Sequence, residues 1–308
     1  MNITSKRLSS ECKIPVMNKL NSFEYLGCAG NVCRIINQFN SNVYLISAIN
    51  NNGIIEKICR KENINIDYSI LIDNYNQKKK RYISENSQYF RIDNCDILNY
   101  NKYKNIIEHN FIKCLSNNKI DLLIISDYNN GFCSNLKNII KIANDRNIKI
   151  VVDPHGYNLK KYDGCDYIKP NRKEIQQLSG ISIKNDEDIK KYANKIFEYT
   201  SINNIITTNG EKGILYFKRN EDVKIFSTKK INFIDVCGAG DTINSLLSLG
   251  LICNLSIEDI CELANKFASI FISKIGTSKL YFYEIFKYLN KTNEIDLDNL
   301  IILTQFLK

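Results

Sequence analysis

The run "DLLIISDY" (residues 121–128) is followed by "SNLKNIIKIANDRN" (134–147) and then by "IKIVVDPHG" (148–156). The first and third segments are short, apolar and rich in β-branched residues, as in strands that are covered on both faces. The middle segment has the apolar spacing of an amphipathic helix. Strand, helix and strand in this order indicate a βαβ unit, so this stretch predicts an α/β fold built on a mainly parallel sheet.

The alternation continues toward the C-terminus. "CDYIKPN" (165–171) and "INNIITTNGEKGILYF" (202–217) are strand-like, and residues 186–200 between them have a helical pattern. Open α/β sheets bind ligands outside the carboxyl ends of their strands. The polar residues that end the strand-like runs are therefore candidates for one cleft: Asp127, Asp153, Asn171 and Thr208.

The N-terminal part differs in character. "KIPVMNKLNSFEYLG" (13–27) and "KKKRYISENSQYFRID" (78–93) are shorter and more alternating, which predicts a small antiparallel sheet attached to the main layer. Such a sheet can act as a lid, with segments at about 10–26 and 77–93. Neither an internal repeat nor a flexible linker separates it, so residues 1–308 are expected to form a single domain.

Composition excludes several classes of protein. The net charge of +9 is spread along the chain without a basic block, which favours anionic small molecules over nucleic acid as partners. The 11 cysteines lack the paired spacing of a zinc site and indicate reduced, buried side chains. The first residues lack the features of a signal peptide, and no run is long enough to span a membrane. A cytoplasmic protein without membrane partners is expected.

"DVCGAGDTINS" (235–245) lies where a strand-like run gives way to a helical one. Gly238, Ala239 and Gly240 allow a tight turn that gathers backbone N–H groups at the positive end of a helix, and this arrangement attracts anions. Asp241 adds a carboxylate that can accept a proton beside such a site, as phosphoryl transfer to a hydroxyl requires. An aspartate at a helix start is also an ordinary N-cap, and the string alone leaves both interpretations open.

The string "DVCGAGDT" (235–242) resembles the signature of the ribokinase-like, or PfkB, carbohydrate kinases. Three further family strings precede it in the chain, in the order expected of the family: "CAGNV" (28–32), "IKPNRKE" (168–174) and "TTNGEKG" (207–213). Within this family, four strings are most similar to the D-glycero-β-D-manno-heptose-7-phosphate kinases. They are residues 78–93, "SDYNNG" (126–131), "VVDPHG" (151–156) and "KIGTS" (274–278). These kinases occur alone or fused to an adenylyltransferase. The similarity covers roughly residues 4–284.

This resemblance implies a ribokinase-like fold with helices on both sides of the sheet and a small β lid. It also implies ATP-dependent phosphorylation of a sugar or sugar phosphate, most closely the anomeric hydroxyl of a heptose 7-phosphate. Asp241 would be the base, and the amides of residues 238–240 would hold the transferred phosphoryl group. A monovalent cation is a further candidate cofactor, and the family's lids imply a homodimer that pairs through the lid.

Asn171 and Glu174 correspond to the family pair that organises Mg²⁺ and its waters, and oxygen ligands suit this ion. The same two residues also fit a turn that precedes a first-turn glutamate. Thr208 and Gly210 correspond to a loop that contacts nucleotide phosphates, and Asn265 to the adenine pocket. A glycine at a β turn needs no ligand, however, and an asparagine on a helix is usually solvated.

The sugar side of the cleft is assigned by the same resemblance. Asn31 matches the substrate-side asparagine, and Asp127 and Asp153 lie on the substrate side of the predicted cleft. Lys79 and Arg81 are candidates for binding a substrate phosphate, although exposed cations on a strand are often only solvated.

Departures from the family pattern support a second hypothesis. The heptose kinases begin with a strand ending in a "GDxMLD"-like string, and Met1 falls after that point. The chain therefore looks truncated at its start, and we expect either that the true start lies upstream or that another segment fills the place of the first strand. The C-terminal "LDNLIILTQFLK" (297–308) is an apolar candidate for its place, but it also fits a packed amphipathic helix. Cys28 stands where a glycine is expected, and Asn130 and His155 replace lysines. The alternative function is thus a non-catalytic protein that binds nucleotide or sugar in a regulatory or structural role.

Overall fold

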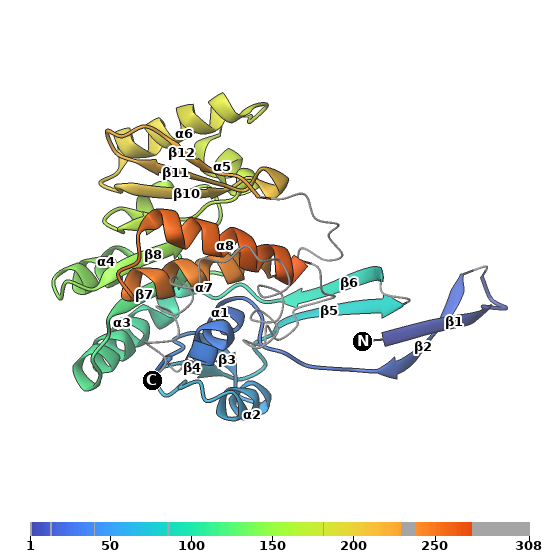
Figure 1. Ribbon diagram of the computed structural model, residues 1–308. Helices are drawn as coiled ribbons and strands as arrows, with labels where there is room; N and C mark the ends of the chain where they lie inside the picture. Colours follow the sequence, from blue (N-terminus) through green and yellow to red (C-terminus); the bar gives the residue numbers. More distant parts are fainter. Residues whose placement is uncertain are drawn as a thin grey trace.

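The computed structural model describes residues 2–12, 14–39, 41–84, 87–180, 182–228 and 238–272. Figure 1 shows an α/β body from which a small sheet projects. The strands of the main sheet are β7 (Leu122–Ser126), β8 (Lys149–Asp153), β9 (Tyr167–Ile168), β10 (Asn204–Thr208), β11 (Ile214–Lys218) and β12 (Lys224–Phe226). Their order is β12-β11-β10-β9-β8-β7. Neighbours from β7 to β10 are parallel, and β11 and β12 are antiparallel to their neighbours, which confirms the predicted α/β class.

The predicted βαβ unit is formed by β7, α4 (Lys137–Asn144) and β8, with Ser126 paired to Asp153 at the carboxyl end. Successive side chains of β8 enter different cores: Val151 packs in one, and Ile150 and Val152 pack in the other. The strand is buried on both faces, which is why its sequence is continuously apolar.

Helices cover both faces of the main sheet (Figure 1). One core contains α1 (Ala29–Ile36), α7 (Ala239–Ile252) and α8 (Ile257–Ile272). The other contains α3 (Tyr100–Asn117), α4, α5 (Arg172–Ser179) and α6 (Asp186–Tyr199). Three 3₁₀ turns, η1 (Asn37–Phe39), η2 (Leu159–Tyr162) and η3 (Gly210–Lys212), lie between larger elements. Helix α7 is buried along residues 241–251, so its first turn is fixed inside the body.

A separate two-stranded parallel sheet consists of β3 (Ala48–Asn50) and β4 (Ile70–Ile72), which are connected through α2 (Ile54–Lys61). Among the described strands, β7 is hydrogen-bonded to β8 alone, so the main sheet ends at β7. The expectation of a missing or replaced first strand stays a prediction. Residues 297–308, its suggested substitute, lie outside the described residues, as do residues 235–237 and 274–278.

The projecting sheet has the order β2-β1-β5-β6. Its strands are β1 (Asn2–Leu8), β2 (Pro15–Asn21), β5 (Gln77–Ser84) and β6 (Ser87–Cys95). The pairs β1–β2 and β5–β6 are antiparallel, and one parallel contact between Asn2 and Ile83 joins them. Strand β2 falls in the first segment expected to form the lid, and the β5–β6 hairpin covers the second and extends two residues beyond it, to Cys95. Strand β1 was not predicted, because "NITSKRL" is mostly polar and lacks a clear alternation.

Over the described part of the chain, no helix has the length and apolar character needed to cross a bilayer.

Candidate active site

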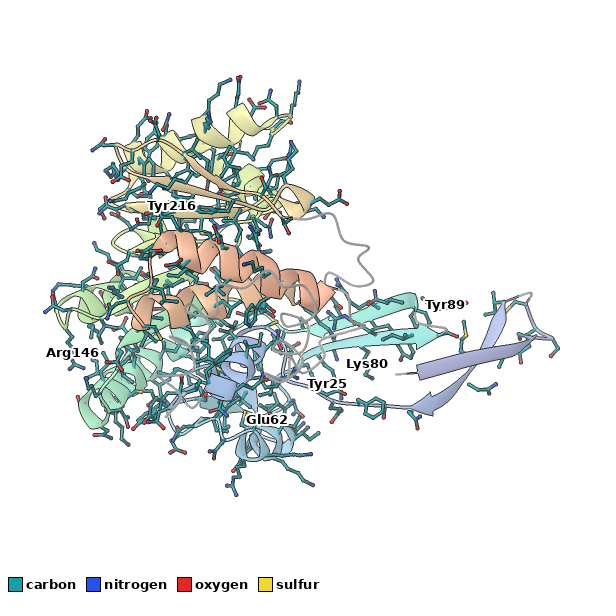
Figure 2. All side chains as sticks on the ribbon, in the orientation of Figure 1. Tyr25, Glu62, Lys80, Tyr89, Arg146 and Tyr216 are labelled. Carbon is teal, nitrogen blue, oxygen red and sulfur yellow. The ribbon has the colours of Figure 1, made fainter. Side chains whose placement is uncertain are left out.

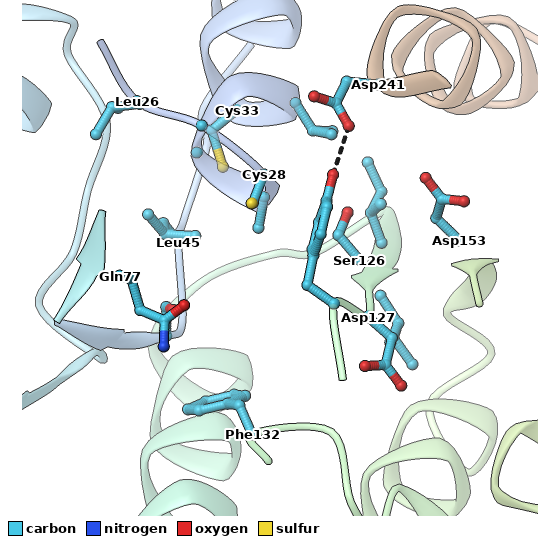
Figure 3. A pocket seen from close by; sticks show the side chains of 18 of the residues that line it. Leu26, Cys28, Cys33, Leu45, Gln77, Ser126, Asp127, Phe132, Asp153 and Asp241 are labelled. Atoms are coloured by element: carbon cyan, nitrogen blue, oxygen red, sulfur yellow. Dashed lines mark hydrogen bonds between the residues drawn. The ribbon is translucent and has the colours of Figure 1, made fainter. Parts of the chain in front are cut away.

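A cleft of about 1560 Å³ runs along β7 and reaches the carboxyl edge of the main sheet, and the lid strand β5 bounds it on another side. The predicted site residues that line it are Lys79, Arg81, Asp127, Asp153, Asn171, Glu174, Thr208, Gly210, Gly238, Gly240 and Asp241. Figure 3 shows Asp127, Asp153 and Asp241 around this space. The strand ends and the start of α7 therefore do share one cleft, as their places in the βα pattern predicted.

The first turn of α7 is shaped to receive an anion. Gly238 is the N-cap, and its φ of 87° belongs to the left-handed region that favours glycine. The amides of Ala239 and Gly240 follow, and first-turn amides have no partner within their own helix. These N–H groups and the positive end of the helix dipole would favour a phosphate beside them.

Asp241 is the third residue of α7 and does not cap it, so the N-cap interpretation of this aspartate is wrong. Its Oδ2 accepts a hydrogen bond of 2.8 Å from Nδ2 of Asn31 in α1. Its Oδ1 accepts one of 2.7 Å from the hydroxyl of Tyr128, drawn as the dashed line in Figure 3. Burial raises the pKa of Asp241, while the two hydrogen bonds and the charges of Lys169 and Lys79 oppose the rise.

Lys169 brings a buried cation to the same place. Its Nζ lies 2.8 Å from Oδ1 of Asp153, and a Cβ added at Gly240 would lie 3.8 Å from that Nζ. Burial alone would lower the pKa of Lys169, but the carboxylates of Asp153 and Glu174 outweigh it and raise the pKa, so the lysine is charged. Lys169 was not singled out from the sequence, although a lysine at the polar end of an apolar strand is itself a signal.

Asp127 is held from three directions inside the cleft wall. Its Oδ2 is 2.5 Å from Nζ of Lys161 and accepts a 2.7 Å hydrogen bond from the hydroxyl of Tyr162. Its Oδ1 accepts a 2.7 Å bond from the amide of Asn129. This carboxylate organises the loop after β7, and its substrate-binding role stays a prediction. Neither Lys161 nor Tyr162 was singled out from the sequence, because their contacts depend on the fold.

Asn171 and Glu174 form a complete capping box at the start of α5. Asn171 Oδ1 accepts from the amide of Glu174 at 3.0 Å, and Glu174 Oε2 accepts from the amide of Asn171 at 2.7 Å. The helix-start alternative thus describes their geometry, yet both residues also line the cleft. A carboxylate offers about four acceptor positions, so the box leaves capacity for the waters of a metal ion.

The donor set suits a loosely held hard cation. Among the described residues, no three His, Cys, Asp or Glu side chains gather with the geometry of a metal site. The Glu174 carboxylate fits Mg²⁺, which keeps several of its waters and is usually held by one or two carboxylates together with phosphates. Oδ1 of Asn171 already accepts from the amides of Lys173 and Glu174, at 2.9 and 3.0 Å. Glu174 is therefore the residue that would hold the ion, and a role of Asn171 beside it stays a prediction.

The nucleotide-side candidates separate into two groups. Thr208 ends β10, where it bridges to Asn171, and Gly210 begins η3 with a φ of 58°; both line the cleft. Asn265 on α8 is not one of the described lining residues. It is only 8% exposed, and its Nδ2 donates a 2.8 Å bond to the carbonyl of Phe226. Asn265 is therefore not solvated, and its contact with adenine stays a prediction.

The lid strand β5 carries the predicted phosphate-binding cations. Because side chains alternate along a strand, Lys79 and Arg81 lie on the same face of β5. The Nζ of Lys79 is 5.6 Å from the centroid of the Tyr128 ring, which is within cation–π range. This contact connects the lid to the loop after β7. Arg81 is half-buried at the cleft wall.

The three departures from the family pattern have distinct surroundings. Cys28 precedes α1 with a φ of 56°, which residues with a side chain seldom adopt, and burial raises the pKa of its thiol to about 11. Its sulfur is therefore protonated at neutral pH and is not a ready nucleophile. The amide of His155 donates a 2.9 Å bond to the Tyr162 hydroxyl, and the carbonyl of Asn130 accepts one of 2.7 Å from Leu98. Hydrogen bonds thus hold the backbone of both His155 and Asn130 in the cleft wall.

Sequence comparison matches residues 8–281 to the family described as "pfkB family carbohydrate kinase". The bifunctional protein HldE of Aliarcobacter butzleri is 31% identical over 298 residues, which cover 93% of this chain and 62% of that protein. The HldE protein of Campylobacter jejuni is 30% identical over 298 residues, which cover 95% and 62%. The chain thus spans about three fifths of the length of these relatives.

Structural comparison gives the same fold. Phosphofructokinase-2 from Escherichia coli, solved in complex with potassium, has a TM-score of 0.72 at 19% identity, and the match covers 94% of this chain and 95% of that one. Ribokinase from Thermotoga maritima has a TM-score of 0.63 at 20% identity, with 94% and 96% covered. At such low identity this likeness establishes the fold alone, and it confirms the predicted ribokinase-like architecture.

Proposed function

Because the chain belongs to the PfkB family of carbohydrate kinases, we propose that it transfers the γ-phosphoryl group of ATP to the anomeric hydroxyl of a heptose 7-phosphate. The observation that carries the proposal is the position of the Asp241 carboxylate in the first turn of α7, at the wall of the cleft. The heptose specificity rests on the string resemblance and on relatives named HldE, which this chain matches over part of their length.

In the proposed reaction the acceptor hydroxyl donates its proton to Asp241 while its oxygen bonds to the γ-phosphorus. The bond between that phosphorus and the bridging oxygen breaks, and ADP leaves. The amides of Gly238, Ala239 and Gly240 hold the charged oxygens of the group in transfer, and fixed dipoles of this kind lower the barrier most where charge develops. The Lys169 ammonium, next to Gly240, adds positive charge at the same place.

Glu174 and Asn171 would orient Mg²⁺ through its waters, and the bound ion would neutralise charge on the nucleotide phosphates. Thr208 and Gly210 would contact those phosphates from the end of β10. On the acceptor side, Lys79 and Arg81 of the lid would bind the sugar's phosphate, because both cations face the cleft that Asp241 lines. Potassium in the related phosphofructokinase-2 suggests testing a monovalent cation here.

A second function is favoured by one specific observation. Two of the carboxylates assigned to the sugar side, Asp127 and Asp153, are already engaged by lysines whose side chains are 9% and 2% exposed. A protein that binds nucleotide without turning over a sugar would tolerate this arrangement and the strained backbone at Cys28. The alternative is therefore a catalytically impaired relative with a regulatory or structural role.

The deciding experiment measures ADP release by the purified chain across a panel of sugar phosphates that includes D-glycero-D-manno-heptose 7-phosphate and fructose 6-phosphate. We expect turnover with the heptose, a new anomeric phosphate by ³¹P NMR, and loss of both signals in Asp241→Asn. ATP binding by calorimetry without turnover on any acceptor would instead support the non-catalytic function.

We further propose that two copies of this chain pair through the lid. Phe90 and Ile92 of β6 are 41% and 48% exposed, and they pair with Tyr82 and Lys80 on the face opposite Lys79. Figure 2 shows Lys80 and Tyr89 on this projecting hairpin. Phe90→Lys with Ile92→Lys should convert a dimer to a monomer in light scattering, whereas Ile106→Lys on α3, at a similar exposure, should not. A wild-type monomer would contradict the pairing.

A further inference from the structure

The carboxylate of Asp241 is held at both of its oxygens. Asn31 donates to Oδ2 at 2.8 Å and Tyr128 donates to Oδ1 at 2.7 Å. The two donors are not equivalent, because Asn31 is wholly buried whereas Tyr128 is part-exposed and lines the cleft. Oδ1 is therefore the oxygen that a molecule in the cleft would reach beside the tyrosine hydroxyl.

Tyr128 is placed rigidly at this point. It follows Asp127, whose amide donates a 3.0 Å bond to the carbonyl of Asp153 on the neighbouring strand. On its other side, Asn129 has a φ of 53° and its amide is bonded to the Asp127 side chain. Hydrogen bonds thus fix the backbone before and after Tyr128, so its phenol is held in place beside Asp241.

The charges around Asp241 come from several elements. The facing groups are Lys169 after β9, Lys79 of β5, Asp153 of β8 and Cys28 before α1. Burial raises the pKa of Asp241, and the hydrogen bonds from Asn31 and Tyr128 are the largest effects that lower it. The Lys79 ammonium over the phenol ring also favours the hydroxyl as a donor, because it draws electron density from the ring.

We propose that Tyr128 is a positioning residue for the phosphoryl transfer, holding Oδ1 of Asp241 ionised and turned to the cleft while the acceptor hydroxyl uses the same oxygen. A carboxylate oxygen has two lone pairs, so both donors can be accepted at once. In the transfer, the acceptor O–H bond breaks and its proton goes to Oδ1, while the Tyr128 O–H bond stays intact. The catalytic consequence of this inference rests on the proposed function. The hydrogen bond between Tyr128 and Asp241 does not depend on that function.

The matched control is a tyrosine whose hydroxyl is bonded elsewhere. Tyr216 of β11 is 4% exposed and donates to Oδ1 of Asn204 at the same 2.7 Å. Figure 2 shows it in the main sheet, apart from the projecting hairpin. Tyr216→Phe therefore removes a buried hydroxyl bond of equal length without touching Asp241.

The test reads the titration of the Asp241 carboxyl by ¹³C NMR in the unliganded protein, with the signal assigned through Asp241→Asn. A hydrogen bond to a charged group has a strength that corresponds to about 1–2 pH units. We expect Tyr128→Phe to raise the pKa of Asp241 by about that amount and Tyr216→Phe to leave it unchanged. Replacing Tyr128 by 3-fluorotyrosine, a stronger donor, should lower it and serves if the phenylalanine variant misfolds.

The kinetic arm compares kcat and the acceptor KM across pH. We expect Tyr128→Phe to lower kcat about tenfold or more and to leave the acceptor KM little changed. The acid limb of the pH–kcat profile should move to higher pH, by the same amount as the pKa of Asp241. An unmoved Asp241 titration in both Tyr128 variants would overturn the inference, and so would a rise in kcat, which would make the tyrosine an obstacle. Lack of turnover by the wild type, with the titration shifted as expected, would refute the proposed function and leave the bond established.

Discussion

The Nζ of Lys169 and Oδ1 of Asp153 lie 2.8 Å apart inside the protein, where 2% of the lysine side chain and 13% of the aspartate side chain are exposed. This pair joins the end of β8 to the residue after β9, at the wall of the cleft. Because both charges are desolvated, each depends on the other for its stability inside the fold.

Removal of one partner should destabilise the fold strongly. Lys169→Met leaves Asp153 as a buried, uncompensated carboxylate, which costs about 3–5 kcal/mol of unfolding free energy. The control is Lys224→Met, which breaks the pair with Glu258, half-exposed on both sides, and should destabilise the fold far less, because solvent screens this pair. Urea denaturation measures both. Equal losses in the two variants would show that the Lys169 pair contributes no more than a surface contact.

Cys28 offers a stabilising substitution. Its φ of 56° strains any residue with a Cβ, at a cost of about 1–3 kcal/mol. Glycine relieves the strain but adds about 0.5–1 kcal/mol of unfolded-chain entropy. Cys28→Gly should therefore raise the unfolding free energy by about 1 kcal/mol. Cys28→Ala keeps the Cβ and is the control, so a melting temperature no higher for glycine than for alanine would argue against strain.

Glu174→Gln separates metal binding from helix capping. The glutamine oxygen can still accept from the Asn171 amide, so the capping box is kept and only the charge is lost. Outer residues of a metal site typically contribute about 10–100-fold, so the Mg²⁺ dependence of kcat/KM for ATP should weaken by about that factor. Nucleotide affinity without metal should change little.

The matched control for Glu174 is Asp188, which completes the capping box of α6 with Asn185. Asp188→Asn removes a carboxylate from the same helical position, at a residue that is not among those lining the cleft. Its Mg²⁺ titration should coincide with that of the wild type. If both variants showed the same Mg²⁺ dependence as the wild type, Glu174 would have a purely structural role.

The local pattern was sufficient to predict the layers of the fold. Apolar runs such as "LLIIS" became β7, and the polar strand ends Asp127 and Asp153 reached one edge, because strand direction in a βαβ unit determines where those ends lie. Local capping also follows from sequence, since Asn171 and Glu174 are three residues apart.

The partners of Asp241 could not be predicted in the same way. Asn31 and Tyr128 are 210 and 113 residues away from it in the chain, and no local pattern selects one polar side chain among many at such a distance. Tyr128 lies inside a string used for the family resemblance. A tyrosine after an apolar strand is, however, also expected where the ring only packs in the core, so the sequence does not show that its hydroxyl has a partner in the site. Asn31 was assigned to the sugar, and this role stays a prediction; its side-chain amide donates to Asp241.

The central claim is that Asp241 is the base, and its most direct test is kcat for sugar phosphorylation in Asp241→Asn, measured across pH beside ATP affinity and melting temperature. Burial raises the pKa of Asp241, so wild-type turnover should be lost as pH falls through a limb above the ordinary aspartate value of about 4. The near-isosteric variant should lower kcat by about 10²–10⁴-fold, remove that limb, and leave ATP affinity and melting temperature little changed. Equal turnover by the two proteins in an active preparation would contradict the account.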